Sequence, residues 1–393
     1  MMAVTKKKIT KTAEKADKTS KALKLAGQLH WAEPAIGHEI ATELLKNAAK
    51  SIADLIPRLS ESNDEQATQA FFALEAIVMT ALDPEVENET CKAVVVALAD
   101  NLPLAKDCYS RSQVIRYLGL LGYDVTEALR SWLDQPEYFE VTLLALRHIG
   151  SLSAFELITE KLATASGNAY TAFALAAADW EEEDAIEPEK MRKALAKAPA
   201  AELPALWNAC ARCGLAFVAE DLLKACQGKT KVLAAAARAS LALLVDSIRN
   251  WEKAVALGQQ FYQTTPCAIS LRTWFDACGQ DITADCYEAL TDAVQEENQV
   301  LRETALELLG KASDSGVETE MLVEFAGSLT APTAKAALLR MLGRHGKMIA
   351  RPLIMASLWD KDLLVRQAAI EAAESLQGKL DARSLQAVVA HRN

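Results

Sequence analysis

The stretch from Asp360 to Lys379, DKDLLVRQAAIEAAESLQGK, reads as one amphipathic helix with its own start and end signals. Asp360 and Asp362 supply carboxylate oxygens that accept hydrogen bonds from the free N–H groups of a first helical turn. The apolar residues that follow recur at i, i+3, i+4 and i+7, so they share one helical face. Gly378 is the residue type that most often closes a helix in the left-handed conformation. The stretch therefore predicts a helix with one buried face.

The same arrangement occurs twice upstream. It is found in QEENQVLRETALELLGK, residues 295–311, and in TAPTAKAALLRMLGRHGK, residues 330–347. The basic residues Arg302, Lys335 and Arg366 are 33 and 31 residues apart. Partner segments that are also apolar on a helical period lie between these helices. The unit is a helix, a turn and a second helix, which is then repeated.

Glycines follow a similar period. Gly310 and Gly343, which we interpret as closing residues of helices, are 33 residues apart. Gly122 and Gly150 are 28 residues apart in more degenerate copies of the unit. A period in this range is typical of an α-solenoid, in which each helix pair buries its apolar face only by stacking on its neighbours.

The pattern of an acidic or proline-containing turn, then V-R or L-R, then aliphatic residues ending in L-G resembles the second helix of a HEAT-type repeat. The match is clearest in residues 293–393, and it identifies no subfamily. The resemblance implies an all-α fold, a right-handed α-solenoid of antiparallel helix pairs. It also implies that Arg302, Lys335 and Arg366 either hydrogen-bond neighbouring turns or form a ligand-facing basic ridge. HEAT-like arrays mostly serve as scaffolds and adaptors, while a minority are enzymes or nucleic-acid binders.

Length and composition agree with a helical array. Aromatic residues make up 6% of the 393 residues, and Gly and Pro number only 16 and 11. A solenoid grows by addition and need not split into compact domains. We expect five segments: a Lys-rich flexible arm at 1–27, N-terminal helical repeats at 28–180, an acidic loop at 181–190, irregular Ala-rich helical pairs at 191–292, and regular HEAT-like repeats at 293–393.

Charge is distributed unevenly along the chain. The net charge is −11, but residues 1–24 carry eight lysines against two acids, so the rest of the chain carries −17. A Lys-rich arm contacts nucleic acid, an anionic membrane or an acidic partner through charge alone, and the alternative is a solvated tail. The acidic body disfavours wrapping a phosphate backbone. The arm residues singled out are Lys6, Lys7, Lys8 and Lys11.

The densest acidic stretch is DWEEEDAIEPEK, residues 179–190. It interrupts the helical periodicity, which predicts a long loop or a seam between two arrays. One hypothesis makes Trp180, Glu181, Glu182 and Glu183 an electronegative docking site. The alternative is a solvated turn.

No set of residues identifies a reaction. His38 lacks the second His four positions later that a zinc-protease helix needs, and Cys210 and Cys213 form a single CxxC with no second ligand pair. Glycine loops for phosphates and serine-hydrolase motifs are not found. We expect no metal and no cofactor. The eight cysteines, together with the lack of a secretory signal, predict reduced thiols in a cytoplasmic protein.

The leading interpretation is an intracellular scaffold that binds another protein on the solenoid surface. The acidic balance favours a partner with a basic or amphipathic segment. A first alternative is a nucleic-acid binder that uses the arm, and a second is a HEAT-like lyase-type enzyme. The predicted partner-binding residues, besides the acidic stretch, are Arg302, Lys335, Arg340, Arg344 and Arg366.

Overall fold

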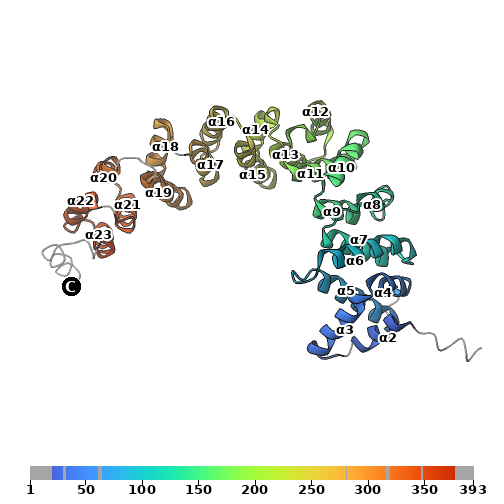
Figure 1. The fold of residues 1–393 in the computed structure, drawn as a ribbon. Helices are drawn as coiled ribbons and strands as arrows, with labels where there is room; N and C mark the ends of the chain where they lie inside the picture. The colour runs from blue at the N-terminus through green and yellow to red at the C-terminus, as the bar shows by residue number, and fades with distance from the viewer. Residues whose placement is uncertain are drawn as a thin grey trace, which may run out of the picture. The chain divides into compact units, whose positions relative to one another are not determined.

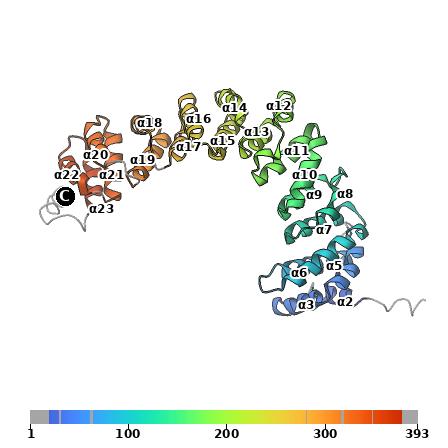
Figure 2. The same ribbon diagram turned by 45° about the horizontal axis from the view of Figure 1, so that its top comes forward.

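The computed structural model describes residues 20–29, 32–60, 64–279, 281–314, 319–346 and 348–376. Every regular element within these ranges is a helix, which confirms the all-α fold. Contacts between helices divide the chain into two compact units, and the division falls between Trp180 and Glu181. Each unit is a stack of helix pairs (Figures 1 and 2).

In the first unit, the odd-numbered helices from α5 onward pack side by side in one layer, and the even-numbered helices pack against them. This arrangement follows from the apolar stripe on each helix, which is buried only where two pairs meet. The helices are α2 (Lys21–Leu29), α3 (Pro34–Lys46), α4 (Ala48–Leu55), α5 (Glu65–Ala81), α6 (Asn88–Asn101), α7 (Cys108–Leu121), α8 (Thr126–Leu133), α9 (Phe139–Ile149), α10 (Leu152–Thr164) and α11 (Gly167–Ala177).

The second unit repeats this plan. Its odd-numbered helices again form one continuous layer, from α13 to α23, with an even-numbered partner beside each. The helices are α12 (Pro188–Lys197), α13 (Leu203–Arg212), α14 (Ala219–Cys226), α15 (Lys231–Ser247), α16 (Trp251–Thr264), α17 (Ala268–Cys278), α18 (Ala284–Gln295), α19 (Gln299–Asp314), α20 (Thr319–Ser328), α21 (Pro332–Arg344), α22 (Arg351–Ser357) and α23 (Leu363–Ser375).

The start signals that the sequence predicts for α23 are confirmed. The Asp362 carboxylate accepts a hydrogen bond from the backbone N–H of Leu364 at 2.8 Å. The Asp360 carboxylate accepts one from the N–H of Asp362 at 3.0 Å. Gly122 and Gly150 end α7 and α9 with φ of 71° and 62°, a region that suits glycine.

The interpretation of Gly310 and Gly343 as closing residues is wrong. Both lie inside helices, α19 and α21, at places where a neighbouring group occupies the space of a side chain, and a Cβ on Gly310 would lie 2.5 Å from Nε2 of His345. A Cβ on Gly343 would lie 2.5 Å from Cα of Ala372 on α23. A Cβ on Gly119 of α7 would likewise lie 2.7 Å from Cα of Ala145 on α9. Gly119 and Gly343 thus allow neighbouring odd-numbered helices to approach closely, whereas a side chain fills the space beside Gly310.

The chain around the acidic stretch forms two short 3-10 helices, at Ala178–Trp180 and Glu183–Ala185, and α12 begins at Pro188, near the end of the stretch. Proline at the first position of a helix needs no hydrogen-bond partner for its nitrogen, so the chain re-enters a helix there. The break in periodicity is thus a non-α segment of about two short turns.

Candidate partner-binding surface

The odd-numbered helices of the first unit carry large apolar side chains that are open to solvent. Phe72 and Met79 on α5, Tyr109 and Leu120 on α7, and Leu144 on α9 are between 43% and 57% exposed. The two residues on α5 are seven positions apart and the two on α7 are eleven apart, so each pair shares one helical face. Neighbouring exposed apolar side chains of this size indicate an interaction site.

Two grooves run across this surface. One lies between α7 and α9 and has a volume of about 300 Å³. The other lies between α9 and α11 and has a volume of about 680 Å³. Glu140 and Leu144 line both grooves, so Leu144 stands on the ridge between them. We call this area, from Phe72 to Leu144 with both grooves, the odd-helix surface.

The charges in these grooves differ in how they are neutralised. The Asp134 carboxylate accepts a hydrogen bond from Nζ of Lys161 at 2.5 Å, and Arg147 forms an ion pair with Asp179. Within the described part of the chain, the carboxylates of Glu137 and Glu140 make no ion pair with a cation. Arg116 on α7 lines the same groove, so the odd-helix surface presents two carboxylates and one guanidinium beside its apolar side chains.

A half-buried tyrosine of α7, Tyr117, lies near Glu75 of α5 on this surface. Partial burial, together with the charge of Glu75 and the nearby Tyr109, raises the pKa of Tyr117 to about 12. Its hydroxyl therefore stays protonated at neutral pH and remains a hydrogen-bond donor. An edge-to-face contact between Phe71 and Tyr109, with ring centroids 5.4 Å apart, joins the same two helices.

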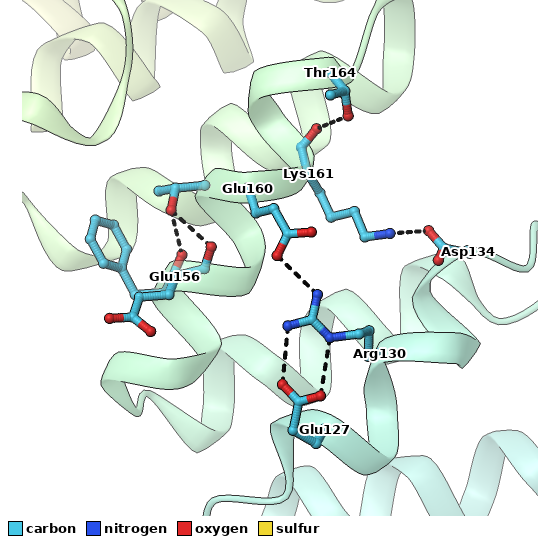
Figure 3. A network of polar contacts seen from close by, with 9 residues as sticks. Glu127, Arg130, Asp134, Glu156, Glu160, Lys161 and Thr164 are labelled. Atoms are coloured by element: carbon cyan, nitrogen blue, oxygen red, sulfur yellow. Dashed lines mark hydrogen bonds and ion pairs between the residues drawn. The ribbon is translucent and has the colours of Figure 1, made fainter.

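The even-numbered helices behind the odd-helix surface are tied to one another by polar contacts (Figure 3). Arg130 on α8 donates to Glu127 at 3.0 and 3.2 Å and to Glu160 on α10 at 2.9 Å. These hydrogen bonds raise the pKa of Arg130, so it stays charged. Lys161 on α10 reaches back to Asp134 at the end of α8. The network links α8 to α10, and one of its members, Asp134, also lines the groove between α9 and α11.

No family model matches the chain, and no curated protein matches it by sequence. Its fold is similar to solved structures of Kap121p. The Kap121p structure bound to Ste12p is 12% identical over 94% of this chain and 46% of that chain, with a TM-score of 0.56. The structure of the karyopherin Kap121p bound to the extreme C-terminus of the protein phosphatase Cdc14p is 11% identical over 95% and 46%, with a TM-score of 0.54.

These structures are solenoids of helix pairs, as each unit here is. The chain is a HEAT-like α-solenoid. At this level of identity the similarity shows the fold alone. The solenoid described here spans less than half the length of the Kap121p chains it matches.

The basic series predicted from the sequence comprises Arg302, Lys335, Arg340, Arg344 and Arg366. Three of its members form polar contacts with the turns between helices. Arg302 donates to the carbonyl oxygen of Glu296 at 3.1 Å. Arg366 donates from Nη1 to the carbonyl oxygens of Asp360 and Lys361, at 2.9 and 3.1 Å. Nζ of Lys335 lies 2.8 Å from the Asp360 carboxylate, so it links α21 to the next turn. These hydrogen bonds are the ones expected if the basic residues are structural.

The two remaining arginines of the series lie on α21. Arg340 pairs with Glu371 on α23, with Nε 2.5 Å from a carboxylate oxygen. Arg344 is exposed at the end of α21. Arg340 and Glu371 each occupy the ninth position of their helix, as do Asp276 on α17 and Glu307 on α19. Partner binding by the basic series stays a prediction.

We expect Arg366→Ala to lower the melting temperature of the solenoid. The change leaves two carbonyl oxygens of one turn without their charged donor, and hydrogen bonds of this kind contribute about 1–3 kcal/mol. Circular dichroism during heating measures the effect. The control is Gln367→Ala at the neighbouring exposed position. Equal melting temperatures for both variants would contradict a structural role.

The hypothesis of a docking site in the acidic stretch involves residues with different surroundings. Trp180 closes the first unit and packs on Phe155, with ring centroids 5.4 Å apart. In the second unit, Glu181 has φ of 55° and lies 3.6 Å from Arg212. Glu182 is exposed. The side chain of Glu183 and the arm residues lie outside the described part of the chain; the arm residues are Lys6, Lys7, Lys8 and Lys11. Their binding roles stay predictions.

The residues considered for chemistry are placed as follows. His38 is exposed on α3. Cys210 and Cys213 are buried, and burial raises their pKa values to about 12 and about 11, which keeps both as thiols. Among the described residues, no three His, Cys, Asp or Glu side chains gather as metal ligands would. Within the same ranges, no helix has the length and apolarity that crossing a membrane requires.

Sequence reasoning did not find the odd-helix surface. Its signal was present, because Phe72, Met79, Tyr109 and Leu120 widen the apolar arc of α5 and α7 beyond what one buried stripe needs. Only the packing of the helices shows which part of that apolar arc stays exposed to solvent.

Proposed function

We propose that this chain is a protein-interaction scaffold and that the odd-helix surface is where a partner protein binds. The observation that carries the proposal is the group of five large apolar side chains exposed on α5, α7 and α9. Water-exposed side chains of this kind gain free energy when a partner covers them, at about 25 cal/mol per Å² of apolar area. The similar solenoid Kap121p has been solved bound to Ste12p and to the C-terminus of Cdc14p, which supports a protein ligand.

The partner segment that best fits this surface is an amphipathic helix. An apolar face would cover Leu120 and Leu144 and enter the groove between α9 and α11. Lysine or arginine at the border of that face would meet Glu137 and Glu140, which form no ion pair within the described residues although Arg116 lines the same groove. The charge match would speed association and set the register of the helix.

Affinity capture from native lysate tests the proposal. The bait is the tagged full chain, compared with the double variant Leu120→Asp and Leu144→Asp. We expect a stoichiometric partner on the wild-type chain and at least an approximately tenfold loss on the variant, because two central contacts become unpaired charges in a desolvated interface.

The matched control is Leu152→Asp on α10. Leu152 is 70% exposed but belongs to an even-numbered helix, outside the odd-helix surface. Its variant should capture as much partner as the wild-type chain. A partner that stays bound to the Leu120 and Leu144 variant, or that is lost equally with Leu152→Asp, would overturn the assignment of the surface.

A further inference from the structure

Three exposed aliphatic side chains occupy equivalent positions on neighbouring odd-numbered helices of the second unit. Val232, Ile269 and Val300 are each the second residue of their helix, α15, α17 and α19, and are 75%, 49% and 63% exposed. Helix α15 packs on α17, and α17 packs on α19. We call the three side chains the aliphatic row. Exposed apolar side chains that lie together, rather than singly, mark interaction sites.

The turns that precede these three helices also lie side by side. Nε2 of Gln227, at the end of α14, donates to the carbonyl oxygen of Thr264, at the end of α16, at 3.2 Å. Tyr262, also near the end of α16, lies near the turn between α18 and α19, because partial burial raises the pKa of its hydroxyl and the charge of Glu296 raises it further. The three turns therefore form one edge of the second unit.

The charge changes sign along this edge. Lys229 and Lys231, the lysine pair, are exposed at the start of α15, and Glu296 and Glu297, the glutamate pair, are exposed before α19. Within the described residues, none of the four forms an ion pair. Residues 254–271, which lie between the two pairs, contain no charged residue. A lysine at the first position of a helix, as Lys231 is on α15, opposes the helix dipole, so its charge does not serve that helix.

Other charges near the two pairs do not reverse these signs. Lys224 on α14 is offset by Glu220, which lies 3.9 Å away. Near the glutamate pair, Asp292 and Glu303 are two further exposed acids. Arg302 is the one cation there, and it donates to the carbonyl oxygen of Glu296. The edge is therefore positive at its α15 end and negative at its α19 end.

We propose that this edge is a dimer interface, at which a second copy of this chain binds antiparallel about a two-fold axis through Ile269. A two-fold interface brings the same patch of both subunits together, so a residue at one end of the patch meets a residue at the other end. Val232 of each copy then packs on Val300 of the other. The lysine pair of each copy faces the glutamate pair of the other. The edge is complementary to itself in both apolar contact and charge.

Sedimentation velocity of the full chain over a concentration series tests the interface. We expect a dimer with a dissociation constant of about 10 μM, because three aliphatic side chains and two charged pairs make a small interface. One variant is Lys229→Glu with Lys231→Glu, and the other is Glu296→Lys with Glu297→Lys. Each should weaken its own dimer at least about tenfold, since like charges then face each other at both ends.

A mixture of the two charge variants gives the sharpest result. The first variant is acidic at both ends of the edge and the second is basic at both, so their mixed dimer is matched and should regain at least the wild-type affinity. Each variant moves the net charge of −11 by four, to −15 or to −7, so both stay acidic and overall attraction does not explain the recovery. Recovery also shows that both variants fold. The control is Leu152→Asp in the first unit, which should dimerise as the wild type does.

The variant Ile269→Asp tests the position of the axis. It should abolish the dimer, because two unpaired carboxylates would then meet inside the interface. A chain that stays monomeric up to about 200 μM, a dimer that both charge variants keep, or a mixture that fails to associate would each overturn the proposal. Loss of the dimer in the Leu120 and Leu144 variant would place self-association on the odd-helix surface and overturn it as well.

Discussion

The variant Gly343→Val should unfold the end of the second unit at a lower temperature than the wild-type chain. A Cβ at this position meets Cα, Cβ and O of Ala372 at 2.5, 2.7 and 2.8 Å. Since two of these are backbone atoms, no rotamer change makes room, and α21 and α23 must move apart. Overpacking of this kind costs about 1–3 kcal/mol, and the two methyl groups of valine place the cost at about 3 kcal/mol or more. Thermal unfolding followed by circular dichroism measures it.

The control for this prediction is Gly327→Ala on α20. Its Cβ would meet only a side-chain carbon, Cδ1 of Leu353, at 3.9 Å, an ordinary contact. Alanine also favours a helix over glycine by up to about 1 kcal/mol, so this variant should be neutral or slightly more stable. Hydrogen exchange should show the loss from Gly343→Val concentrated in α21 and α23. A melting temperature at or above that of the wild type would mean that the close approach is not required.

The variant Tyr138→Ala should destabilise the first unit by about 3–5 kcal/mol, as large aromatic deletions in packed cores do. Tyr138 is 1% exposed and directly precedes α9. Its hydroxyl accepts a hydrogen bond from Nη1 of Arg111 on α7 at 3.0 Å, and its ring meets Trp132 on α8 edge-on at 5.1 Å. One side chain therefore joins three helices. Its loss leaves a cavity and takes one acceptor from Arg111.

The variant Tyr138→Phe separates these two effects. It keeps the ring and removes only the hydroxyl, so it should cost about 1–3 kcal/mol, less than the alanine change. Tyr123→Phe is the matched control, because Tyr123 donates to Asn88 at 3.3 Å in an exposed setting. Urea unfolding of all three variants gives the order of their free energies of unfolding. If Tyr138→Phe cost as much as Tyr138→Ala, the ring packing would contribute nothing.

The fold could be predicted from sequence because its determinants are local. The aspartates at the start of α23 and the period of Arg302, Lys335 and Arg366 report on one helix pair at a time, and a solenoid repeats that pair. The meaning of Gly343 could not be predicted, because a glycine near the end of a helical pattern is compatible with a cap or with a close contact. Only the position of Ala372 on the next odd-numbered helix separates the two.

The candidate surfaces were harder to predict than the fold. Leu144 and Leu143 are adjacent apolar residues on α9, and the sequence does not show that the first is 43% exposed while the second is buried. Likewise, Val232 and Val300 are 68 residues apart and belong to one aliphatic row only through the packing of α15 on α17 and of α17 on α19. Local pattern identifies the helices, but long-range packing decides which side chains they leave open.

Charged residues occupy the ninth position of several odd-numbered helices, and this regularity affects how the chain can evolve by duplication. Asp276, Glu307, Arg340 and Glu371 fall at equivalent places on successive odd-numbered helices. A duplication of one helix pair would insert a new member of this row already in register, since each pair contacts only its neighbours. A longer or differently charged ligand surface can then evolve by one duplication and a few point substitutions, without redesign of the core.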